Sequence, residues 1–377
     1  MFNNNFFSSI FGYFFFQKKV RNIKNKKIVF FSESNNYRNY FIELIKALNN
    51  DNNITVLYIT SDQNDLDKID NNIKPIFIGK GFLRILLLAF IECDILIMTL
   101  TDLGNHEIKK SKKCKNYIYL FHSLVSTHKT YTKDAFKNYD IIFSNGDYQK
   151  KELEYVEKML QFPKKKIFNT GYIYLDKLKR EKKQQSISNT VLFAPSWNKS
   201  KKNLFDDYSE SIISELIKNE YKVVLRTHPE LLTRSSSVIK NLTNKFSKSD
   251  KLKINFNISD LQVLNESTIL ITDNGGMAME YFLIQKKPVL FLNYQDKIHN
   301  SKYNDIKLDV IEDTFKKKFG FEINAEEFTN IKSKINEATI KFEALKNNVN
   351  TFAKEKGIIL DNSSENAKNI IKRIIEM

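Results

Sequence analysis

The sequence ISDLQVLNESTILITDNGGMAMEYFLIQKKPVLFL spans Ile258–Leu292 and has the pattern of one strand–turn–helix–strand unit. A short apolar and β-branched run over Ser267–Thr272 predicts a buried strand. Gly275 and Gly276 form the only glycine pair of the chain, and they open a helix that ends before Pro288. The apolar run after that proline predicts the next strand.

The glycine pair has two interpretations. A glycine turn that opens a helix exposes backbone N–H groups beside the positive end of the helix dipole, and this geometry binds phosphate. The alternative is a plain tight turn, in which glycine only relieves backbone strain. Asp273 and Asn274 are turn formers and suit both interpretations. The stretch by itself leaves the two open.

The rest of the chain repeats the same alternation of strands and helices. Examples are the strand-like runs KIVFFS (27–32), NYIYLF (116–121) and YKVVLR (221–226). Such alternation predicts an α/β protein with parallel sheets that helices cover on both faces. We expect two doubly wound, Rossmann-like domains that face a cleft. The expected boundaries are an N-terminal aromatic and basic segment (1–26), a first domain (27–178), a linker (179–190), a second domain (191–345) and a C-terminal helical segment (346–377).

The composition limits the classes of partner. The formal net charge is +16, which suits nucleic acid, an anionic membrane surface or a phosphate-bearing substrate. The lysines are scattered and form no basic–aromatic array, so we expect no nucleic acid. Cys93 and Cys114 have no metal-type spacing, and a reduced cytoplasmic compartment is the simpler interpretation. We expect no structural metal and no required cofactor, while a divalent cation that bridges phosphates stays open.

The N-terminal segment combines aromatic and basic residues. Phe6–Phe16 is apolar but shorter than the roughly 20 residues that span a bilayer core. A basic cluster follows it directly, and this combination favours contact with an anionic membrane face. The alternatives are a frayed terminus or a first helix packed on the body. We therefore expect a cytoplasmic protein, peripheral on the inner face of the cell membrane. The basic cluster is Lys18, Lys19, Arg21, Lys24, Lys26 and Lys27.

Short polar motifs follow the predicted strands, where ligands of doubly wound sheets bind. A histidine there, such as His122 or His228, can take a proton from a hydroxyl or meet a phosphate as a cation. Arg226 adds a permanent charge whose forked donors suit phosphate. The alternatives are structural histidines and a surface arginine. The motifs are Phe121-His122-Ser123, Ala194-Pro195-Ser196-Trp197, Arg226-Thr227-His228-Pro229 and Thr272-Asp273-Asn274-Gly275-Gly276.

An ordered set of these motifs resembles a known family. The chain shows Thr170-Gly171 and then Asp176-Lys177-Leu178, followed by VLFAPSW (191–197), VVLRTHPE (223–230) and KKPVLFLNY (286–294). Their order and strand context resemble the CDP-glycerol glycerophosphotransferase family of teichoic acid and capsule enzymes. The resemblance covers roughly residues 116–294.

The resemblance implies a GT-B architecture with an acceptor domain, a nucleotide-donor domain and an active site in the cleft. Family members transfer glycerol phosphate from CDP-glycerol to an acceptor hydroxyl and release CMP. A lipid-linked or glycan acceptor in cell-surface polysaccharide or teichoic-acid-like synthesis would follow. His122 matches the candidate general base, and His228 matches a histidine that contacts the donor phosphate. The expected substrate-binding residues are Arg226, Ser196, Thr272, Asp273, Asn274, Gly275, Gly276 and Glu280.

The chain departs from the family pattern at two places. Ser123 stands where the family usually has glycine, and Gly275-Gly276 stands where it usually has two serines. The glycine version also resembles UDP-sugar enzymes of GT-B type, including the UDP-N-acetylglucosamine 2-epimerases. In those enzymes a glutamate on this helix binds the ribose, which is the role expected for Glu280 unless it is a plain helix surface charge. A GT-B glycosyltransferase or epimerase using a UDP-sugar is therefore the alternative function. The donor could also be another CDP-alditol, such as CDP-ribitol, which would transfer a related alditol phosphate. His128 is a second candidate for the cleft.

Overall fold

The structure is a computed structural model, which describes residues 4–69, 73–101, 103–104, 108–183, 189–199, 203–257 and 260–376. Residues 184–188 of the expected linker and Ile258 and Ser259 lie outside the described residues. The chain forms two compact units. Unit 1 contains Met1–His122, Thr132–Lys177 and Lys356–Met377, and unit 2 contains Ser123–Tyr131 and Leu178–Glu355.

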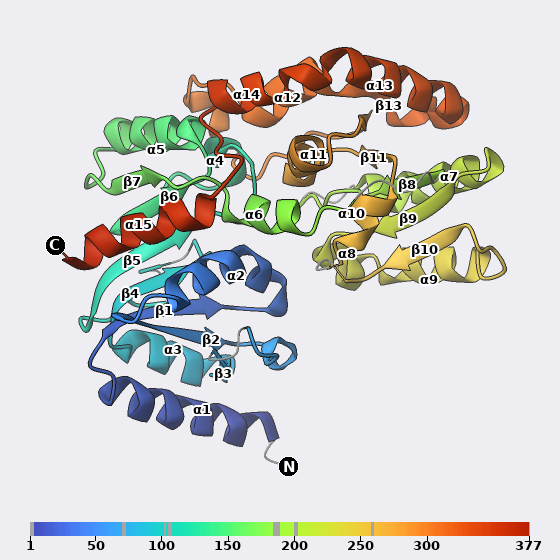
Figure 1. Ribbon diagram of the computed structural model, residues 1–377. Coiled ribbons are helices and arrows are strands. Elements are labelled where there is room, and N and C mark those ends of the chain that lie inside the picture. The colour runs from blue at the N-terminus through green and yellow to red at the C-terminus, as the bar shows by residue number, and fades with distance from the viewer. Residues whose placement is uncertain are drawn as a thin grey trace. The chain divides into compact units, whose positions relative to one another are not determined.

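Unit 1 is built on a seven-stranded parallel sheet with the order β3-β2-β1-β4-β5-β6-β7 (Figure 1). The order runs outward from β1 in both directions, as in a doubly wound Rossmann sheet, so the switch point lies between β1 and β4. The strands are β1 (Lys26–Ser32), β2 (Ile54–Thr60), β3 (Ile76–Phe77), β4 (Cys93–Met98), β5 (Cys114–Leu120), β6 (Ile141–Ser144) and β7 (Lys166–Asn169).

Helices cover both faces of this sheet because its strands are apolar on both sides. On one face α2 (Asn35–Asn49) and α15 (Ser363–Glu376) pack together over β1, β2 and β4, with Phe41 and Ile371 in the shared core. On the other face α1 (Asn4–Arg21) lies against β3 and α3 (Phe82–Phe90) (Figure 1). The remaining helices are α5 (Asp147–Leu160) and α6 (Ile173–Arg180).

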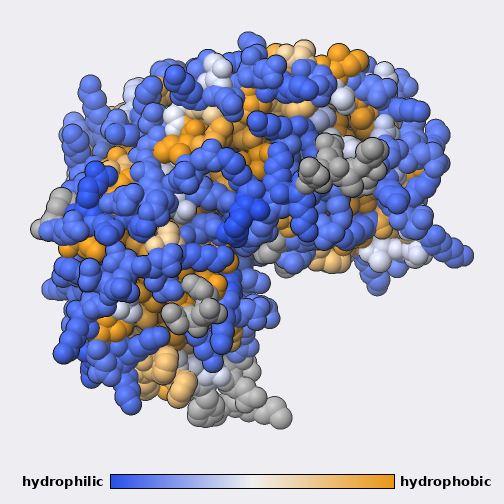
Figure 2. Space-filling model, in the orientation of Figure 1, coloured by the Kyte–Doolittle hydropathy of each residue, from blue (hydrophilic) through white to orange (hydrophobic). Residues whose placement is uncertain are grey.

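The N-terminal segment forms a helix that packs on unit 1. A packed first helix was one of the two alternatives to membrane contact that the sequence left open. Helix α1 approaches β3 closely at Gly12, where a Cβ atom would lie 1.7 Å from the Phe77 carbonyl oxygen. No described helix is long and apolar enough to cross a membrane. Figure 2 shows apolar side chains, in pale orange, on the surface over α1.

The C-terminal helix of the chain returns to unit 1. The carboxylate of Asp176 accepts hydrogen bonds from the backbone N–H groups of Ser363 (3.1 Å) and Ser364 (2.7 Å) and from the Ser364 hydroxyl (2.6 Å). These donors begin α15, whose first N–H groups have no partner within the helix. The Asp176 motif found in the sequence therefore holds α15 in place.

Unit 2 repeats the same topology with six parallel strands in the order β10-β9-β8-β11-β12-β13. Strand β8 lies at the centre, paired with β9 on one side and β11 on the other. This is again a Rossmann order, with the switch point between β8 and β11. The strands are β8 (Thr190–Phe193), β9 (Lys222–Arg226), β10 (Leu252–Asn255), β11 (Ile269–Thr272), β12 (Val289–Asn293) and β13 (Phe321–Asn324).

The core of unit 2 forms where α7 (Leu204–Lys218), α9 (Ser236–Lys245) and α13 (Ile331–Leu345) cover one face of the sheet. The helix that the sequence predicts between the glycine pair and Pro288 divides into α11 (Gly276–Glu280) and a π-helical turn (Tyr281–Gln285). The other helices are α4 (Thr127–Thr130), α8 (Pro229–Arg234), α10 (Gln262–Glu266), α12 (Ile311–Phe319) and α14 (Val349–Glu355).

Residues Ser123–Tyr131, which we call the crossing segment, follow β5 and His122 but pack within unit 2. The Lys129 ammonium donates to both carboxylate oxygens of Asp313, at 3.0 and 3.1 Å, and the Ser126 N–H donates to Glu312 at 3.0 Å. The side chain of Asn300 donates to the carbonyl of His128 at 2.8 Å. Both carboxylates belong to the first turn of α12, so α12 holds this segment by charge and hydrogen bonds.

Gly276 allows the crossing segment to approach α11. A Cβ atom at Gly276 would lie 2.3 Å from the Ser123 hydroxyl oxygen and 3.1 Å from the Leu124 nitrogen. We expect Gly276→Ala to destabilise unit 2 by about 1–3 kcal/mol, as overpacking of a filled interior does. The measurement is the midpoint of urea unfolding followed by Trp197 fluorescence.

The matched variant is Ser123→Gly/Gly276→Ala, which removes the hydroxyl that the new methyl group would meet. It should recover most of the lost stability, whereas Ser123→Gly alone should change the midpoint little. Equal stability of Gly276→Ala and the unchanged protein would show that the close approach has no energetic role.

Candidate functional site

The candidate site of unit 2 lies at the carboxyl ends of three neighbouring strands. Ser196 follows β8, Arg226 and His228 end and follow β9, and Asp273 follows β11. Since β8 pairs with both β9 and β11, the structure brings these sequence-predicted residues to the same edge of one sheet. This edge is the switch point, where doubly wound sheets bind their ligands.

Asp273 ties two of these loops together. Its carboxylate is buried and accepts from the Ser196 N–H (2.7 Å) and the Ser196 hydroxyl (3.0 Å). Burial raises the pKa of the Asp273 carboxyl, while these hydrogen bonds and the charge of Lys297 act in the opposite direction. The Thr272 hydroxyl donates to the Ala194 carbonyl at 2.7 Å. The hydroxyl groups of Ser196 and Thr272 therefore donate their protons to other groups of the protein, and both residues shape the loops.

The glycine pair begins α11 at this edge. Gly275 has φ +147°, a conformation that L side chains rarely adopt, and Gly276 is the residue in close contact with the crossing segment. Glycine is thus required here for two separate reasons, backbone freedom and close approach. The side chain of Asn274 donates to the Gln295 carbonyl at 3.2 Å and braces the turn. Glu280 lies at the end of α11, partly exposed.

Two basic side chains at the end of β9 differ in their surroundings. Arg226 is 4% exposed, and its guanidinium donates to the Asp260 carbonyl at 3.4 Å. His228 caps α8, and its Nδ1 accepts from the Glu230 N–H at 3.2 Å. Because Nδ1 accepts this bond, the neutral ring carries its proton on Nε2. His228 can therefore donate a hydrogen bond from Nε2 to an anion.

Trp197 fixes the plane of the His228 ring. The two rings stack with centroids 5.9 Å apart and planes 23° apart. The Arg234 guanidinium lies 5.5 Å from the Trp197 ring centre, and the His299 ring is 5.8 Å away. Trp197 belongs to one of the strand-end motifs, but its pattern alone predicted no role for it, and none for Arg234 or His299. The signal in the sequence that could have indicated a role for Trp197 was its position directly after the strand-end residue Ser196.

Lys297 and His299 follow β12, and neither was predicted from the sequence to belong to the site. Burial lowers the pKa of Lys297, while the charges of Asp273 and Glu312 act in the opposite direction. Burial, together with the charges of Lys297 and Lys199, lowers the pKa of His299 to about 4. Lys297 is thus a further cation near Asp273, and His299 is neutral at physiological pH.

His122 lies in unit 1, two residues after the end of β5, and aromatic rings surround it. Its ring lies edge-on to Tyr37, with centroids 5.2 Å apart, and 5.8 Å from the ring of Tyr40. The Tyr172 hydroxyl donates to the His122 carbonyl at 3.0 Å. Two tyrosines of α2 and one that follows β7 therefore position this histidine, and sequence alone did not connect them.

His128, the second candidate for the cleft, is 2% exposed within the crossing segment. A side chain that is covered in this way is poorly placed to take a proton from an external hydroxyl. Among the described residues, no group of three or more His, Cys, Asp or Glu side chains is arranged to hold a metal ion.

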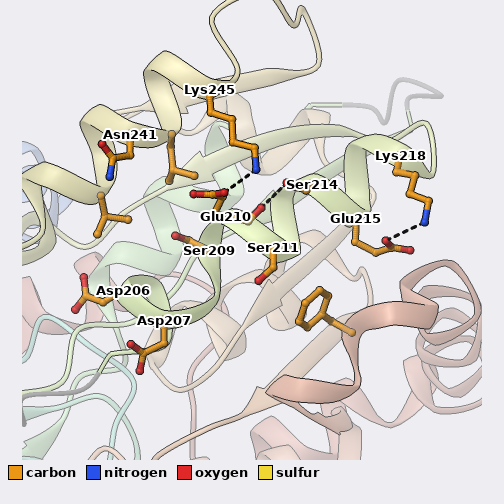
Figure 3. Close-up of a pocket in the computed structure, with 13 residues that line it drawn as sticks. Asp206, Asp207, Ser209, Glu210, Ser211, Ser214, Glu215, Lys218, Asn241 and Lys245 are labelled. Atoms are coloured by element: carbon orange, nitrogen blue, oxygen red, sulfur yellow. Dashed lines mark hydrogen bonds and ion pairs between the residues drawn. The ribbon is translucent and has the colours of Figure 1, made fainter.

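Figure 3 shows a pocket of about 640 Å³ in unit 2 that α7 and α9 line together with Phe328. Four carboxylates line it, and its lysines pair with two of them: Lys245 with Glu210 at 2.6 Å and Lys218 with Glu215 at 3.7 Å. None of the strand-end residues lines this pocket. Its negative charge opposes a phosphate-bearing ligand, so the strand-end edge remains the candidate site.

The family model for CDP-glycerol:poly(glycerophosphate) glycerophosphotransferases matches residues 13–358. The chain belongs to this family. It is a CDP-glycerol glycerophosphotransferase-type enzyme. The resemblance seen in the sequence is thereby confirmed.

Solved structures with the same fold include the wall teichoic acid polymerase TagF, with a TM-score of 0.61 and 16% identity over 100% of this chain and 99% of that one. A UDP-N-acetylglucosamine 2-epimerase, described as putative, from Listeria monocytogenes has a TM-score of 0.66 and 13% identity over 94% and 97%. The UDP-GlcNAc 2-epimerase from Neisseria meningitidis, bound to UDP-GlcNAc, has a TM-score of 0.61 and 14% identity over 93% of this chain and 100% of that one. A comparison with curated proteins finds no match.

These neighbours confirm the predicted fold class, since the chain has the two Rossmann-like units of GT-B enzymes. At 13–16% identity they show the fold alone. The epimerase likeness therefore adds no support for the UDP-sugar alternative, and the family match supports the CDP-glycerol reaction.

The lowered pKa of His299 predicts a dependence of stability on pH. The folded protein leaves this ring neutral down to about pH 4, whereas the unfolded chain protonates it below about pH 6.5. Its contribution to stability is therefore present above pH 6.5 and is lost as the pH falls toward 4. Between pH 7 and pH 5 we expect a loss of about 2 kcal/mol from this group.

The measurement is urea unfolding followed by Trp197, the only tryptophan of the chain, at both pH values. His299→Phe keeps a ring beside Trp197 and should lack this part of the pH dependence. If both proteins lose the same stability between pH 7 and pH 5, His299 is not buried in its neutral form.

Proposed function

We propose that the two units divide the reaction between them, with the acceptor served by unit 1 and the nucleotide donor by unit 2. The acceptor hydroxyl oxygen attacks the phosphorus that carries glycerol, and the bond from that phosphorus to the bridging oxygen of CMP breaks. CMP leaves, and the hydroxyl proton passes to His122. The donor charge is neutralised by Arg226, by His228 and by the backbone N–H groups at Gly275 and Gly276.

The observation that carries this assignment is the fixed orientation of His228. The Glu230 N–H holds Nδ1, and Trp197 holds the ring plane, so the Nε2 proton points in one direction without further ordering. Preorganised donors of this kind supply much of the stabilisation in phosphoryl transfer, where positioning and charge are the main tasks. Arg226, two residues before His228, adds a buried positive charge.

His122 suits the role of the base for a different reason. It is partly exposed and lies among tyrosine rings that position it. A partly exposed imidazole can be reached by an acceptor hydroxyl, as a general base must be.

We also propose the setting of the reaction. The acceptor is a lipid-linked or glycan chain of a teichoic-acid-like or capsular polymer, and the enzyme works from the cytoplasm as a peripheral protein on an anionic membrane surface. The aromatic and basic N-terminal helix supports this proposal, because three phenylalanines remain exposed on it beside Lys18 and Arg21. A divalent cation that bridges the donor phosphates is compatible with the site.

The two histidines predict different kinetic defects. His122→Gln removes proton transfer and should lower kcat about 10²–10⁴-fold with little change in KM for CDP-glycerol. His228→Ala removes a phosphate donor and should lower kcat/KM for CDP-glycerol about 10²–10³-fold. The assay measures CMP release at several donor concentrations.

His228→Asn is the matched control, since asparagine can accept the Glu230 N–H and restore the cap of α8 without replacing the imidazole. It should be as inactive as His228→Ala. Full activity of His228→Asn would reduce His228 to a helix cap and remove it from the site.

Donor identity predicts a selective thermal shift. A ligand that binds only the native state stabilises it by about 2.7 kcal/mol at a concentration of 100 Kd. CDP-glycerol and CMP should raise the melting temperature, and UDP-N-acetylglucosamine and UDP should not. Stabilisation by the UDP compounds alone, with UDP release in turnover, would reinstate the UDP-sugar alternative and the ribose role of Glu280.

A further inference from the structure

The pocket of Figure 3, which we call the acidic pocket, carries a net negative charge although the chain as a whole is strongly basic. All four of its carboxylates belong to α7, and its two lysines pair with Glu210 and Glu215. Asp206 and Asp207 are exposed, and neither forms an ion pair with a lysine or arginine in the part of the chain that the structure describes. Two carboxylate charges are therefore left for a cation from outside the chain.

A buried hydroxyl without a partner lies in the wall of the acidic pocket. Ser209 is 1% exposed, and its oxygen forms no hydrogen bond with any described residue. Ser211 and Ser214 on the same helix, by contrast, donate to backbone carbonyls at 3.1 and 2.7 Å. In Figure 3 the Ser209 oxygen points from α7 toward the side where Asn241 of α9 lies. A buried polar group without a partner costs free energy, and an occupant with an N–H donor would remove that cost.

The spacing of the carboxylates does not suit a single metal ion. At a rise of 1.5 Å per residue, Asp206 and Glu215 lie about 14 Å apart along the axis of α7. The oxygen ligands of a hard metal ion converge on it at about 2.0–2.6 Å. Among the described residues, no group of three or more His, Cys, Asp or Glu side chains is arranged in this way. A cation that meets this row of carboxylates must carry its charges at separate points.

Apolar side chains line another part of the acidic pocket. Val238 and Leu242 come from α9, and Phe328 comes from the turn after β13. Such side chains suit the methylene groups of a ligand, and an aromatic ring attracts a cation that lies over its face. The volume of about 640 Å³ lies within the range of small-ligand sites. The ligand that fits these features has an aliphatic chain between positive charges.

We infer that the acidic pocket binds a linear aliphatic diamine or polyamine. One ammonium group meets Asp206 and Asp207, a further N–H group donates to the Ser209 oxygen, and the methylene chain lies against Phe328. No strand-end residue of the candidate site lines this pocket. The amine site is therefore additional to the proposed phosphotransfer and does not depend on it.

Hydrogen bonds connect the acidic pocket with two loops of the candidate site. Asp206 accepts from the Asn203 amide at 3.3 Å, and the Asn203 oxygen accepts from the N–H of Asn198, in the loop after β8, at 2.7 Å. Asp207 accepts from the hydroxyl of Tyr294, which follows β12. An amine that meets Asp206 and Asp207 therefore contacts the side chains that brace both loops.

The test is isothermal titration calorimetry of the full chain at low ionic strength with spermidine, putrescine, butylamine and MgCl₂, which requires no turnover. Spermidine and putrescine should bind at one site per chain, and butylamine, which has one charge, should bind about fivefold more weakly than putrescine. Asp206→Asn/Asp207→Asn keeps two hydrogen-bond acceptors but removes both charges. This pocket pair should weaken putrescine binding about tenfold.

Ser209→Ala tests the buried hydroxyl with two measurements. It should weaken putrescine binding about two- to tenfold, because the amine loses a hydrogen-bond acceptor. It should not lower the midpoint of urea unfolding measured without amine, because it removes a buried polar group that has no partner. A clear loss of stability in Ser209→Ala would show that the hydroxyl is already satisfied in the folded protein, and would overturn its role in the site.

The matched control is Asp250→Asn/Asp309→Asn, which removes two exposed carboxylates elsewhere in unit 2 and should leave putrescine binding unchanged. If this control weakens binding as much as the pocket pair does, the attraction is one of general charge and the site is overturned. Failure of both spermidine and putrescine to bind would overturn it too. Binding of butylamine or Mg²⁺ as tight as that of putrescine would contradict a ligand with separated charges.

Discussion

The hydrogen-bonded pair of Asp273 and Ser196 is the interaction on which the candidate site depends. It joins the loops after β11 and β8, the two strands at the switch point of the unit 2 sheet. A buried carboxylate that loses its donors would leave an uncompensated charge, so this pair fixes both loops strongly. Trp197 follows Ser196, and Gly275 follows Asp273 by two residues. The plane of the His228 ring and the start of α11 are therefore both set from this one carboxylate.

The crossing segment has a comparable role for His122, the proposed base. It begins one residue after His122, and its ion pair and hydrogen bonds to the first turn of α12 hold it in unit 2. Gly276 belongs to the start of α11 and also provides the space for Ser123. The glycine pair consequently serves the backbone geometry of the proposed phosphate site and the anchoring of the segment that follows the proposed base. A serine at position 276, which is typical of the family, would carry its side chain into that space, and a glycine at the position of Ser123 would relieve the conflict from the other side.

The local pattern of the chain was sufficient to predict the α/β class, the two Rossmann-like units and the strand-end positions of His122, Arg226, His228 and Asp273, because strand and helix periodicity and turn chemistry are local properties. It also predicted the family through the order of its motifs. It did not predict contacts between residues far apart in the chain: the stacking of Trp197 on His228, the partial burial of Lys297 and His299, and the tyrosines around His122. The packing of Ser123–Tyr131 in unit 2 and the pairing of α1 with α3 belong to the same group. Such features depend on which surfaces meet after folding, and only the tertiary structure determines burial, pKa and the direction in which a side chain points.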